Sequence, residues 1–306
     1  MLRKTEGAST LKLDAEGYGK LVEVFTAALY ASVLRPGDTA VDGGVCGGMH
    51  LIPMSRLVGA RGAVYGFEAN PVLLLDIEGR IAKEGADAAR LFGKALGDAQ
   101  GQMRFLARQD NIGLSQLVAE TTHVPEDREL GRLIEVDVVR LDSIVPSPVA
   151  FIKLDLEGAD FLGIKGAEAL LRQGKPILIF ENSRAYAAEQ YGYTMEAFLA
   201  FFEDIGYLVV DIHGRVLTPA TWHDDTMSWE FIAIAKSDER IRDLFVFINR
   251  FWTQAAGLPV IEKWHQCPEI GVALAAGHGQ EDPAAPQKPT ASTETAPPQR
   301  WWRRGG

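Results

Sequence analysis

A glycine-rich turn holds the first residues whose types and spacing could do chemistry. Residues 41–48 read Val-Asp-Gly-Gly-Val-Cys-Gly-Gly and end a short apolar run. In α/β folds, a turn of this kind after the first strand brings the backbone close to a cofactor. The dinucleotide pattern G-x-G-x-x-G fails in both registers, whereas Asp-x-Gly-x-x-x-Gly fits through Asp42, Gly44 and Gly48.

The carboxylate of Asp42 favours one class of cofactor over another. A pyrophosphate at the N-terminus of the following helix would be repelled by this negative charge. S-adenosylmethionine (SAM) carries a sulfonium and an ammonium group and no phosphate, so an aspartate suits it. The alternative is that Asp42 only caps the following helix.

A second carboxylate follows the next apolar run, residues 63–67. Glu68 stands 20 residues after Gly48, where an acidic side chain at a strand end can accept hydrogen bonds from a ribose diol. Its alternative role is a carboxylate near the positive end of a helix. Together with the Asp42 turn, Glu68 favours a SAM site. Asp98, in the loop after the third strand, is expected to contact the adenine.

Three charged residues follow the pattern Lys-x-Asp-x-Glu at the end of another apolar run: Lys153, Asp155 and Glu157. Residues two apart share one face of a strand, and a buried lysine is costly unless it is paired. Lys153 is expected either to form an ion pair or to have a lowered pKa and act as a general base. Asp155 is expected beside the reactive methyl group of the cofactor, and Glu157 to begin a helix.

Oxygen ligands for a metal ion are also present. The fifth apolar run ends at Glu181 and Asn182, and with Asp155 these residues could form an all-oxygen site of the kind that Mg²⁺ prefers. The alternative is a metal-free site in which Glu181 binds the acceptor. A divalent metal therefore stays an open expectation.

Two histidines could act as a base near neutral pH. His50 follows the glycine turn, and His223 lies in the loop before the last strand. A solvated loop residue is the alternative for His223. The expected catalytic residues are thus His223 together with Asp155, Lys153 and Glu181.

The elements that must position these residues alternate along the chain. Continuous apolar runs indicate buried strands, and amphipathic stretches between them indicate helices. Their order indicates a doubly wound, mostly parallel α/β sheet. A last pair of strands has no helix between its members and should be antiparallel. The expected strands are 39–42, 63–67, 90–95, 149–155, 176–181, 207–211 and 230–235, and the helices 50–58, 72–83, 159–172, 194–205 and 238–252.

Four segments are expected. Residues 1–36 form an N-terminal helical segment, and residues 37–237 form the SAM-binding domain, with an inserted β-hairpin within 101–140. A C-terminal helical extension follows at 238–274. The proline-rich end, 275–306, should be a disordered tail, because it has too few apolar residues to offset the entropy lost on folding.

Composition excludes some classes of function. There are 31 basic and 41 acidic residues, a net charge of −10, which disfavours a non-specific nucleic-acid binder. Two cysteines cannot form a disulfide framework, and the chain has neither an apolar leader at its N-terminus nor an apolar run long enough for a spanning helix. A cytoplasmic protein with a small-molecule hydroxyl acceptor is expected, and a homo-oligomer stays open.

At this point the residues resemble a known group. The Asp42 and Glu68 motifs are similar to those of class I SAM-dependent methyltransferases. The segments 111–115, 141–144, 151–160 and 164–167 resemble the FkbM family in particular, and the resemblance covers about residues 35–236. It implies a seven-stranded Rossmann-like sheet with an antiparallel last strand. It also implies methyl transfer to a hydroxyl on a sugar, lipid or secondary metabolite.

Two other functions stay open. The first is a catalytically silent binding or scaffold protein on the same fold, because Cys46 and the Glu181-Asn182 segment depart from the usual sequence of the family. A nicotinamide oxidoreductase is the other, and the failed G-x-G-x-x-G pattern and Asp42 argue against it.

Overall fold

The computed structural model describes residues 15–109, 111–119 and 131–256. The expected tail at 275–306 and the beginning of the N-terminal segment lie outside these residues. In the described part, no helix combines the length and the apolar character needed to cross a membrane. The division of the chain into four segments stays a prediction.

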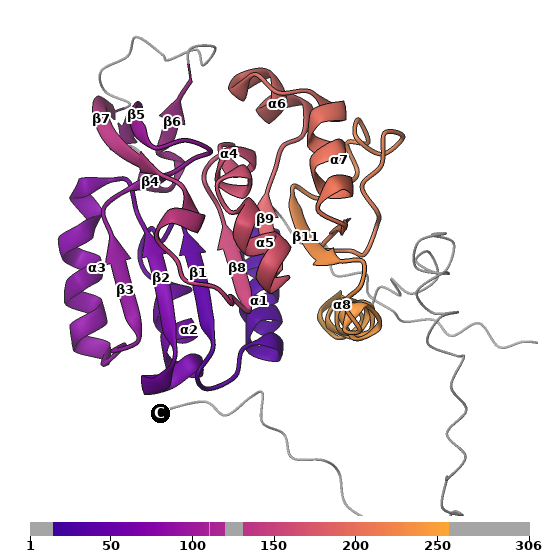
Figure 1. The fold of residues 1–306 in the computed structure, drawn as a ribbon, viewed down its shortest axis with the longest axis horizontal. Helices are drawn as coiled ribbons and strands as arrows, with labels where there is room; N and C mark the ends of the chain where they lie inside the picture. Colours follow the sequence, from indigo (N-terminus) through magenta and orange to yellow (C-terminus); the bar gives the residue numbers. More distant parts are fainter. Residues whose placement is uncertain (1–14, 110, 120–130, 257–306) are drawn as a thin grey trace, which may run out of the picture.

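A seven-stranded sheet forms the centre of the molecule, in the order β10-β11-β9-β8-β1-β2-β3 (Figure 1). All neighbours pair in parallel except β11, which is antiparallel to both β9 and β10. This confirms the expected fold class. The strands are β1 (Thr39–Gly43), β2 (Ala63–Phe67), β3 (Ala89–Phe92), β8 (Phe151–Leu154), β9 (Ile177–Glu181), β10 (Tyr207–Asp211) and β11 (Glu230–Ala235).

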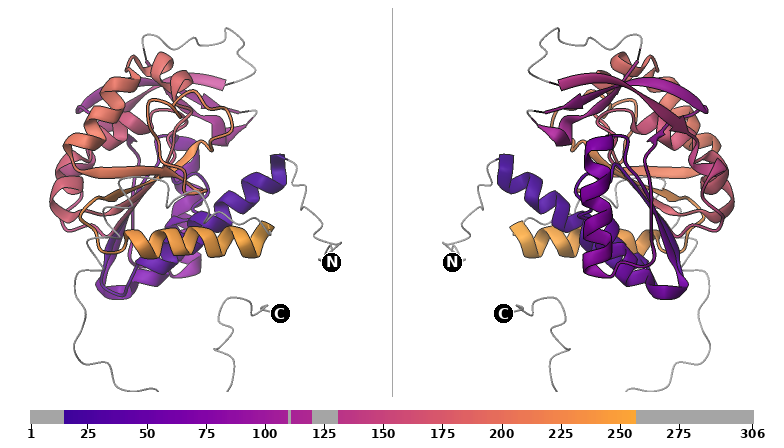
Figure 2. Two further views of the ribbon diagram at one scale, coloured as in Figure 1. Left: turned by 90° about the vertical axis from the view of Figure 1, so that its right-hand side faces the viewer. Right: turned by 90° about the vertical axis from the view of Figure 1, so that its left-hand side faces the viewer.

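Helices cover both faces of the sheet, so the strands are apolar on both sides. One face packs against α1 (Ala15–Val33), α2 (Leu51–Val58), α3 (Pro71–Glu84) and α8 (Ile241–Ala256). The other packs against α4 (Asp160–Lys165), α5 (Glu168–Gly174), α6 (Ala185–Tyr191) and α7 (Met195–Asp204). Figure 2 shows α1 and α8 together on one side.

Two expected elements are each divided in the structure. The helix expected over 159–172 is interrupted at Gly166, where a Cβ atom would lie 2.1 Å from the carbonyl oxygen of Gly97. The strand expected over 90–95 separates into β3 and β4 (Ala95–Leu96), because β4 leaves the main sheet to pair with β7 (Gly131–Val139). Amphipathic periodicity cannot reveal such a change of partner.

The insert forms a second sheet, in the order β4-β7-β5-β6. Its centre is the antiparallel pair of β5 (Gly101–Arg108) and β7, which confirms the expected hairpin. Two short strands extend it, β4 and β6 (Gln116–Val118). This sheet stands above the carboxyl ends of β1 and β2 (Figure 1).

Parallel pairing brings the candidate residues to one edge. Asp42 on β1 is in register with Gly66 on β2 and with Lys153 on β8. The strand order reverses between β1 and β8, and ligands of open α/β sheets bind at such a switch point, outside the carboxyl ends of the strands.

Candidate functional site

The turn after β1 fits tightly against the segment after β8. Gly44 has φ +78°, and a Cβ atom there would lie 1.9 Å from the carbonyl oxygen of Asp155. Gly48 also has a positive φ, +80°. Only glycine allows the backbone to pass so close in this conformation, which explains the spacing of the glycine motif.

A cavity of about 440 Å³ opens along this edge of the sheet. Its walls come from the turn after β1, the ends of β2 and β8, β4 and the inserted sheet. Gly44, Glu68 and Asp155 line it, whereas Asp42, Gly48 and Asp98 do not. The cavity therefore brings together part of the predicted cofactor set.

Glu68 joins two turns while it lines this cavity. Its Oε2 accepts a hydrogen bond from the backbone N–H of Cys46 at 2.8 Å, and its Oε1 accepts one from the N–H of Asn70 at 2.7 Å. The side chain is buried, and this burial raises its pKa although both hydrogen bonds lower it. The carboxylate thus lies at the end of β2, where a ribose-binding group is expected.

Asp42 lies behind the turn and does not line the cavity. It is completely buried, and its Oδ1 lies 3.7 Å from the Nζ atom of Lys153. Burial raises its pKa, and the lysine charge opposes this shift. Asp42 is therefore placed to hold the strand end through Lys153 rather than to contact a ligand in the cavity.

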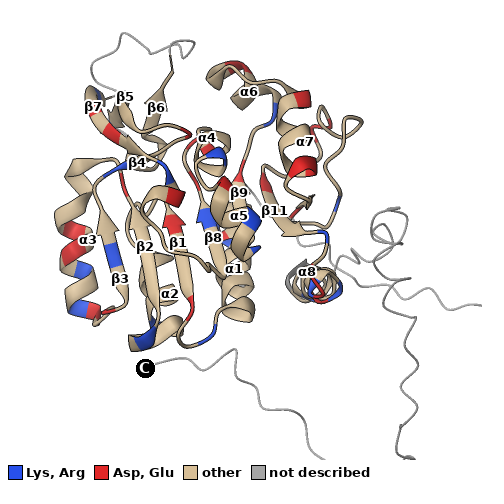
Figure 3. Cartoon of the chain, in the orientation of Figure 1, with Lys and Arg blue, Asp and Glu red and all other residues tan. Residues whose placement is uncertain are grey.

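Lys153 is part of an ion-pair network, one of the two expectations for it. Its Nζ also lies 3.3 Å from Oδ2 of Asp155. Burial opposes the charged form, but Asp155 and Asp42 outweigh it, and the pKa of Lys153 is raised. A general base would need a lowered pKa, so these contacts favour the ion-pair expectation for the free protein. Figure 3 shows the acidic residues at these strand ends.

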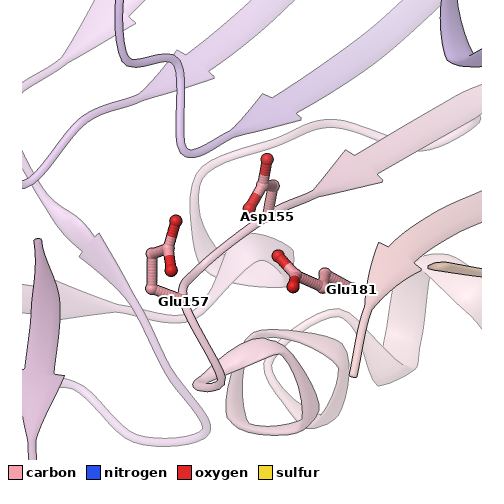
Figure 4. Close-up of side chains that lie close together, drawn as sticks. All are labelled: Asp155, Glu157 and Glu181. Atoms are coloured by element: carbon pink, nitrogen blue, oxygen red, sulfur yellow. The ribbon is translucent and has the colours of Figure 1, made fainter. Parts of the chain in front are cut away.

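Three carboxylates meet beside the network, from Asp155, Glu157 and Glu181 (Figure 4). One oxygen of each lies within 4.8 Å of the others. Burial, followed by the charge of Asp155, raises the pKa of Glu157 to about 7 and that of Glu181 to about 9. Like charges in a partly buried site favour the protonated forms.

The side chain of Asn182 makes hydrogen bonds within the protein, and its part in the expected metal site stays a prediction. Its side chain is fully buried, donates a hydrogen bond from Nδ2 to the hydroxyl of Tyr193 and accepts one at Oδ1 from the N–H of Arg184. The carboxylate cluster that the fold brings together includes Glu157. Glu157 was expected only to begin a helix, and its positive φ of +53° turns it toward the cluster.

Two other predicted residues lie away from the cavity. His223 is exposed in the loop between β10 and β11 and lines none of the described cavities. Asp98 is half-exposed, and its Oδ2 pairs with Nζ of Lys165 at 2.5 Å. The contacts of Asp98 with Lys165 and Arg140 tie the insert to α4, and the expected contact of Asp98 with the adenine stays a prediction.

Two segments contribute residues to the site that the sequence motifs did not predict. The insert contributes Ile112, Gly113 and Ser115 to the cavity wall, and the family-like wording of 111–115 was the signal for them. From α1 comes Glu23, whose Oε2 lies 2.7 Å from Nε2 of His50. Nothing in the sequence near Glu23 pointed to this contact, because α1 precedes every motif.

A second, smaller cavity of about 120 Å³ adjoins the first. It lies between α1 and the ends of β8, β9 and β11, and Glu181 and Glu230 line it. Glu23, Lys153 and Asp155 line both cavities. These three residues therefore mark the junction where two ligands could meet.

Comparison with solved structures finds methyltransferases of similar fold. The FkbM methyltransferase of Methylobacillus flagellatus has 18% identity and a TM-score of 0.42, over 68% of this chain and 50% of that one. A putative rRNA methylase of Clostridium thermocellum has 12% identity and a TM-score of 0.42, over 73% of this chain and 96% of that one. A putative methyltransferase of Streptococcus mutans, solved in complex with S-adenosylhomocysteine, has 12% identity and a TM-score of 0.39, over 70% of this chain and 94% of that one. This chain thus spans half of the first of these proteins.

The family is shown by a sequence model and not by these distant structures. A search of curated proteins gave no match. The model of the methyltransferase FkbM domain matches residues 42–209, which is more than half of the chain and runs from the glycine turn into β10. The protein therefore belongs to the FkbM family of methyltransferases.

Proposed function

We propose that this protein transfers a methyl group from SAM to a hydroxyl of a small molecule, such as a sugar, a lipid or a secondary metabolite. The observation that carries this proposal is the pair of adjoining cavities. One is bounded by Glu68 and the glycine turn, the other lies on the far side of Asp155, and they share a junction. A donor and an acceptor can then meet at the edge where the parallel strands end.

The larger cavity has the chemistry to hold SAM. Gly44 gives a ligand access to the backbone of the turn, and Glu68 offers a carboxylate for the ribose hydroxyls. Asp155 and Glu157 offer negative charge to the sulfonium and ammonium groups. A pyrophosphate would meet the same carboxylates unfavourably, which again argues against a nicotinamide cofactor.

The reaction is a displacement in which the acceptor oxygen forms a bond to carbon. When bound, SAM supplies an activated methyl group, whose C–S bond breaks with the electron pair staying on sulfur. We assign the proton of the acceptor hydroxyl to Asp155, which lines both cavities. Lys153, whose Nζ lies 3.3 Å from Oδ2 of Asp155, holds this carboxylate in position. Closeness and orientation then supply much of the rate.

Glu181 has a different proposed role from that of a base. With a pKa of about 9, its carboxyl is protonated at neutral pH in the free protein and cannot accept a proton. It lines the smaller cavity and not the larger one. We therefore assign Glu181 to acceptor binding.

A divalent cation is a second candidate occupant of the carboxylate cluster. Asp155, Glu157 and Glu181 supply oxygen atoms, which suit a hard cation. Methyl transfer measured after treatment with EDTA, and again after Mg²⁺ is restored, tests this requirement. Loss of activity that Mg²⁺ restores would establish the metal, and unchanged activity would exclude the requirement.

The cofactor is tested by calorimetric titration with SAM, with S-adenosylhomocysteine (SAH) and with NAD. We expect SAM and SAH to bind at micromolar concentration and NAD not to bind. Glu68→Gln should weaken SAH binding by about 10- to 100-fold, because it removes a charged acceptor that the backbone N–H groups and the ribose need, a loss of about 1.5–3 kcal/mol.

The control is Glu78→Gln, a change at an exposed glutamate of α3, which should leave the affinity unchanged. Binding of neither sulfur ligand would contradict the proposal and favour the scaffold alternative. Binding of NAD instead would favour the oxidoreductase. A cytoplasmic location stays a prediction.

A further inference from the structure

The smaller cavity is partly built from elements outside the family domain. Residues 42–209 define that domain, yet Glu23 comes from α1 and Glu230 from β11. The family domain supplies Lys153, Asp155 and Glu181. Part of the side that faces away from the cofactor position thus comes from outside the residues that the family model matches, and its chemistry bears on which acceptor this protein selects.

Among the described residues, four carboxyl groups and one basic residue line this cavity, and the basic residue is already engaged. The carboxyls belong to Glu23, Asp155, Glu181 and Glu230. The lysine, Lys153, is paired with Asp155 and with the buried Asp42 behind the turn. The cavity is therefore rich in hydrogen-bond acceptors and poor in positive charge.

Among these carboxyls, that of Glu181 has the fewest contacts with groups that could neutralise it or donate hydrogen bonds to it. No described residue donates a hydrogen bond to it, whereas Glu23 contacts His50 and Glu230 accepts a hydrogen bond from Ser228. Glu181 and Glu230 are paired on adjacent strands, and both carboxyls line the cavity together with those of Glu23 and Asp155. A cation among these groups would relieve the repulsion, whereas an anion would increase it.

On the α1 side of the junction, the side chain of His50 holds Glu23 in position. His50 is 5% exposed and lines the larger cavity, and its Nδ1 has no hydrogen-bond partner among the described residues. Its Nε2 contacts the carboxylate of Glu23. The imidazole therefore directs Glu23, which lines both cavities, toward the place where donor and acceptor meet.

Aromatic side chains lie beside the smaller cavity. A third hollow, of about 480 Å³, is lined by Tyr18, His213, Trp229 and Glu230, and Glu230 is shared with the smaller cavity. Trp229 is 54% exposed. Aromatic faces beside carboxylates are favourable surroundings for an organic cation.

We propose that the cavity between α1 and the ends of β8, β9 and β11 binds the acceptor, and that Glu23, Glu181 and Glu230 select an acceptor with a protonated amine beside the hydroxyl that is methylated. The inference rests on the proposed function and narrows it to amino alcohols. In this arrangement the ammonium group lies among the carboxylates, and the hydroxyl faces Asp155 at the junction.

The test uses three small probes of matched shape on the full chain saturated with SAH. They are 2-aminocyclohexanol, cyclohexane-1,2-diol and 2-hydroxycyclohexanecarboxylate, which are a cation, a neutral molecule and an anion near neutral pH. We expect the amine to bind at least about tenfold more tightly than the diol, a difference of about 1.4 kcal/mol, and the carboxylate not to bind. With radiolabelled SAM in place of SAH, the amine should be the preferred methyl acceptor.

Two variants test which residues cause the preference for the amine. Glu181→Gln and Glu230→Gln should each reduce binding of the amine by about tenfold while SAH affinity is kept, which also shows that the variants fold. Glu189→Gln, a change at an exposed residue of α6, is the matched control and should change neither affinity.

Several outcomes would overturn the inference. Equal binding of amine and diol, binding of the carboxylate, or no binding of any probe to the SAH complex would each do so. Tight binding of Mg²⁺ to these carboxylates, lost in Glu181→Gln and without a preference for the amine, would assign the charge to a metal site. Failure of SAH itself to bind would contradict the proposed function first, and the two failures are therefore distinguishable.

Discussion

At the scale of single residues, the site depends on how two buried charges are balanced. Lys153 is 6% exposed and Asp42 is completely buried, and each is the other's neighbour across β8 and β1. Breaking a buried pair by removing one partner leaves an uncompensated charge, which is far more costly than removing both. The pair therefore limits which substitutions the strand ends accept.

Replacement of Lys153 by Met is expected to lower the free energy of unfolding by about 3–5 kcal/mol near neutral pH, because Asp42 loses its counter-charge. Denaturant unfolding measures the loss. The double variant with Asp42→Asn should recover a large part of it. A double variant as unstable as Lys153→Met alone would show that the cost has another origin.

Glu181 should make stability depend on pH. Its folded-state pKa of about 9 is above the usual glutamate value, so the folded protein holds a proton that the unfolded chain has lost. The carboxyl groups that act on it are those of Asp155, Asp160, Glu157 and Glu230. Stability contributed by this group is therefore complete at low pH and falls as the pH rises toward 9.

Glu181→Gln should remove this dependence. Between about pH 5 and 9, the free energy of unfolding should fall less steeply than in the parent, and the variant should be the more stable protein at the alkaline end. Urea titrations at several pH values provide the comparison. A steeper fall in the variant would mean that the sign is wrong.

At the scale of elements, α1 is joined to the domain mainly through aromatic packing. The ring of Phe25 is fully buried, and its centroid lies 5.4 Å from that of Phe247, 5.0 Å from Phe251 and 5.8 Å from Trp252. These three partners belong to α8. The helix before the family domain and the helix after it thus hold each other, and together they keep Glu23 at the junction.

Phe25→Ala is expected to cost about 3–5 kcal/mol of stability, because it empties a closely packed aromatic cluster. The neighbouring control is Val24→Ala, since Val24 is 49% exposed and an exposed change usually stays within about 0.5 kcal/mol. Thermal or urea unfolding distinguishes the two. Equal effects would show that α1 does not pack as described.

At the scale of the whole molecule, two helical layers and a second sheet enclose one edge of the main sheet. A ligand held there contacts the turn after β1, the ends of β2 and β8, and the insert at once. Such a ligand binds the folded chain and not the unfolded one. Its binding energy should therefore add to the stability of the whole protein.

SAH at about 100 times its dissociation constant should raise the free energy of unfolding by about 2.7 kcal/mol. The midpoint of thermal unfolding should rise accordingly, and NAD at the same concentration should leave it unchanged. A rise with NAD and none with SAH would contradict the cofactor assignment.

Local sequence patterns determined the strands, the antiparallel last pair, the glycine turn and Glu68, because apolar runs and tight turns are dictated by near neighbours in the chain. Only the tertiary structure decided that Asp42 lies behind the turn, that Glu157 joins the carboxylate cluster and that His223 faces solvent. It also brought Glu23 to the junction. Such outcomes depend on contacts between segments far apart in the chain, and on backbone conformations that residue types do not reveal.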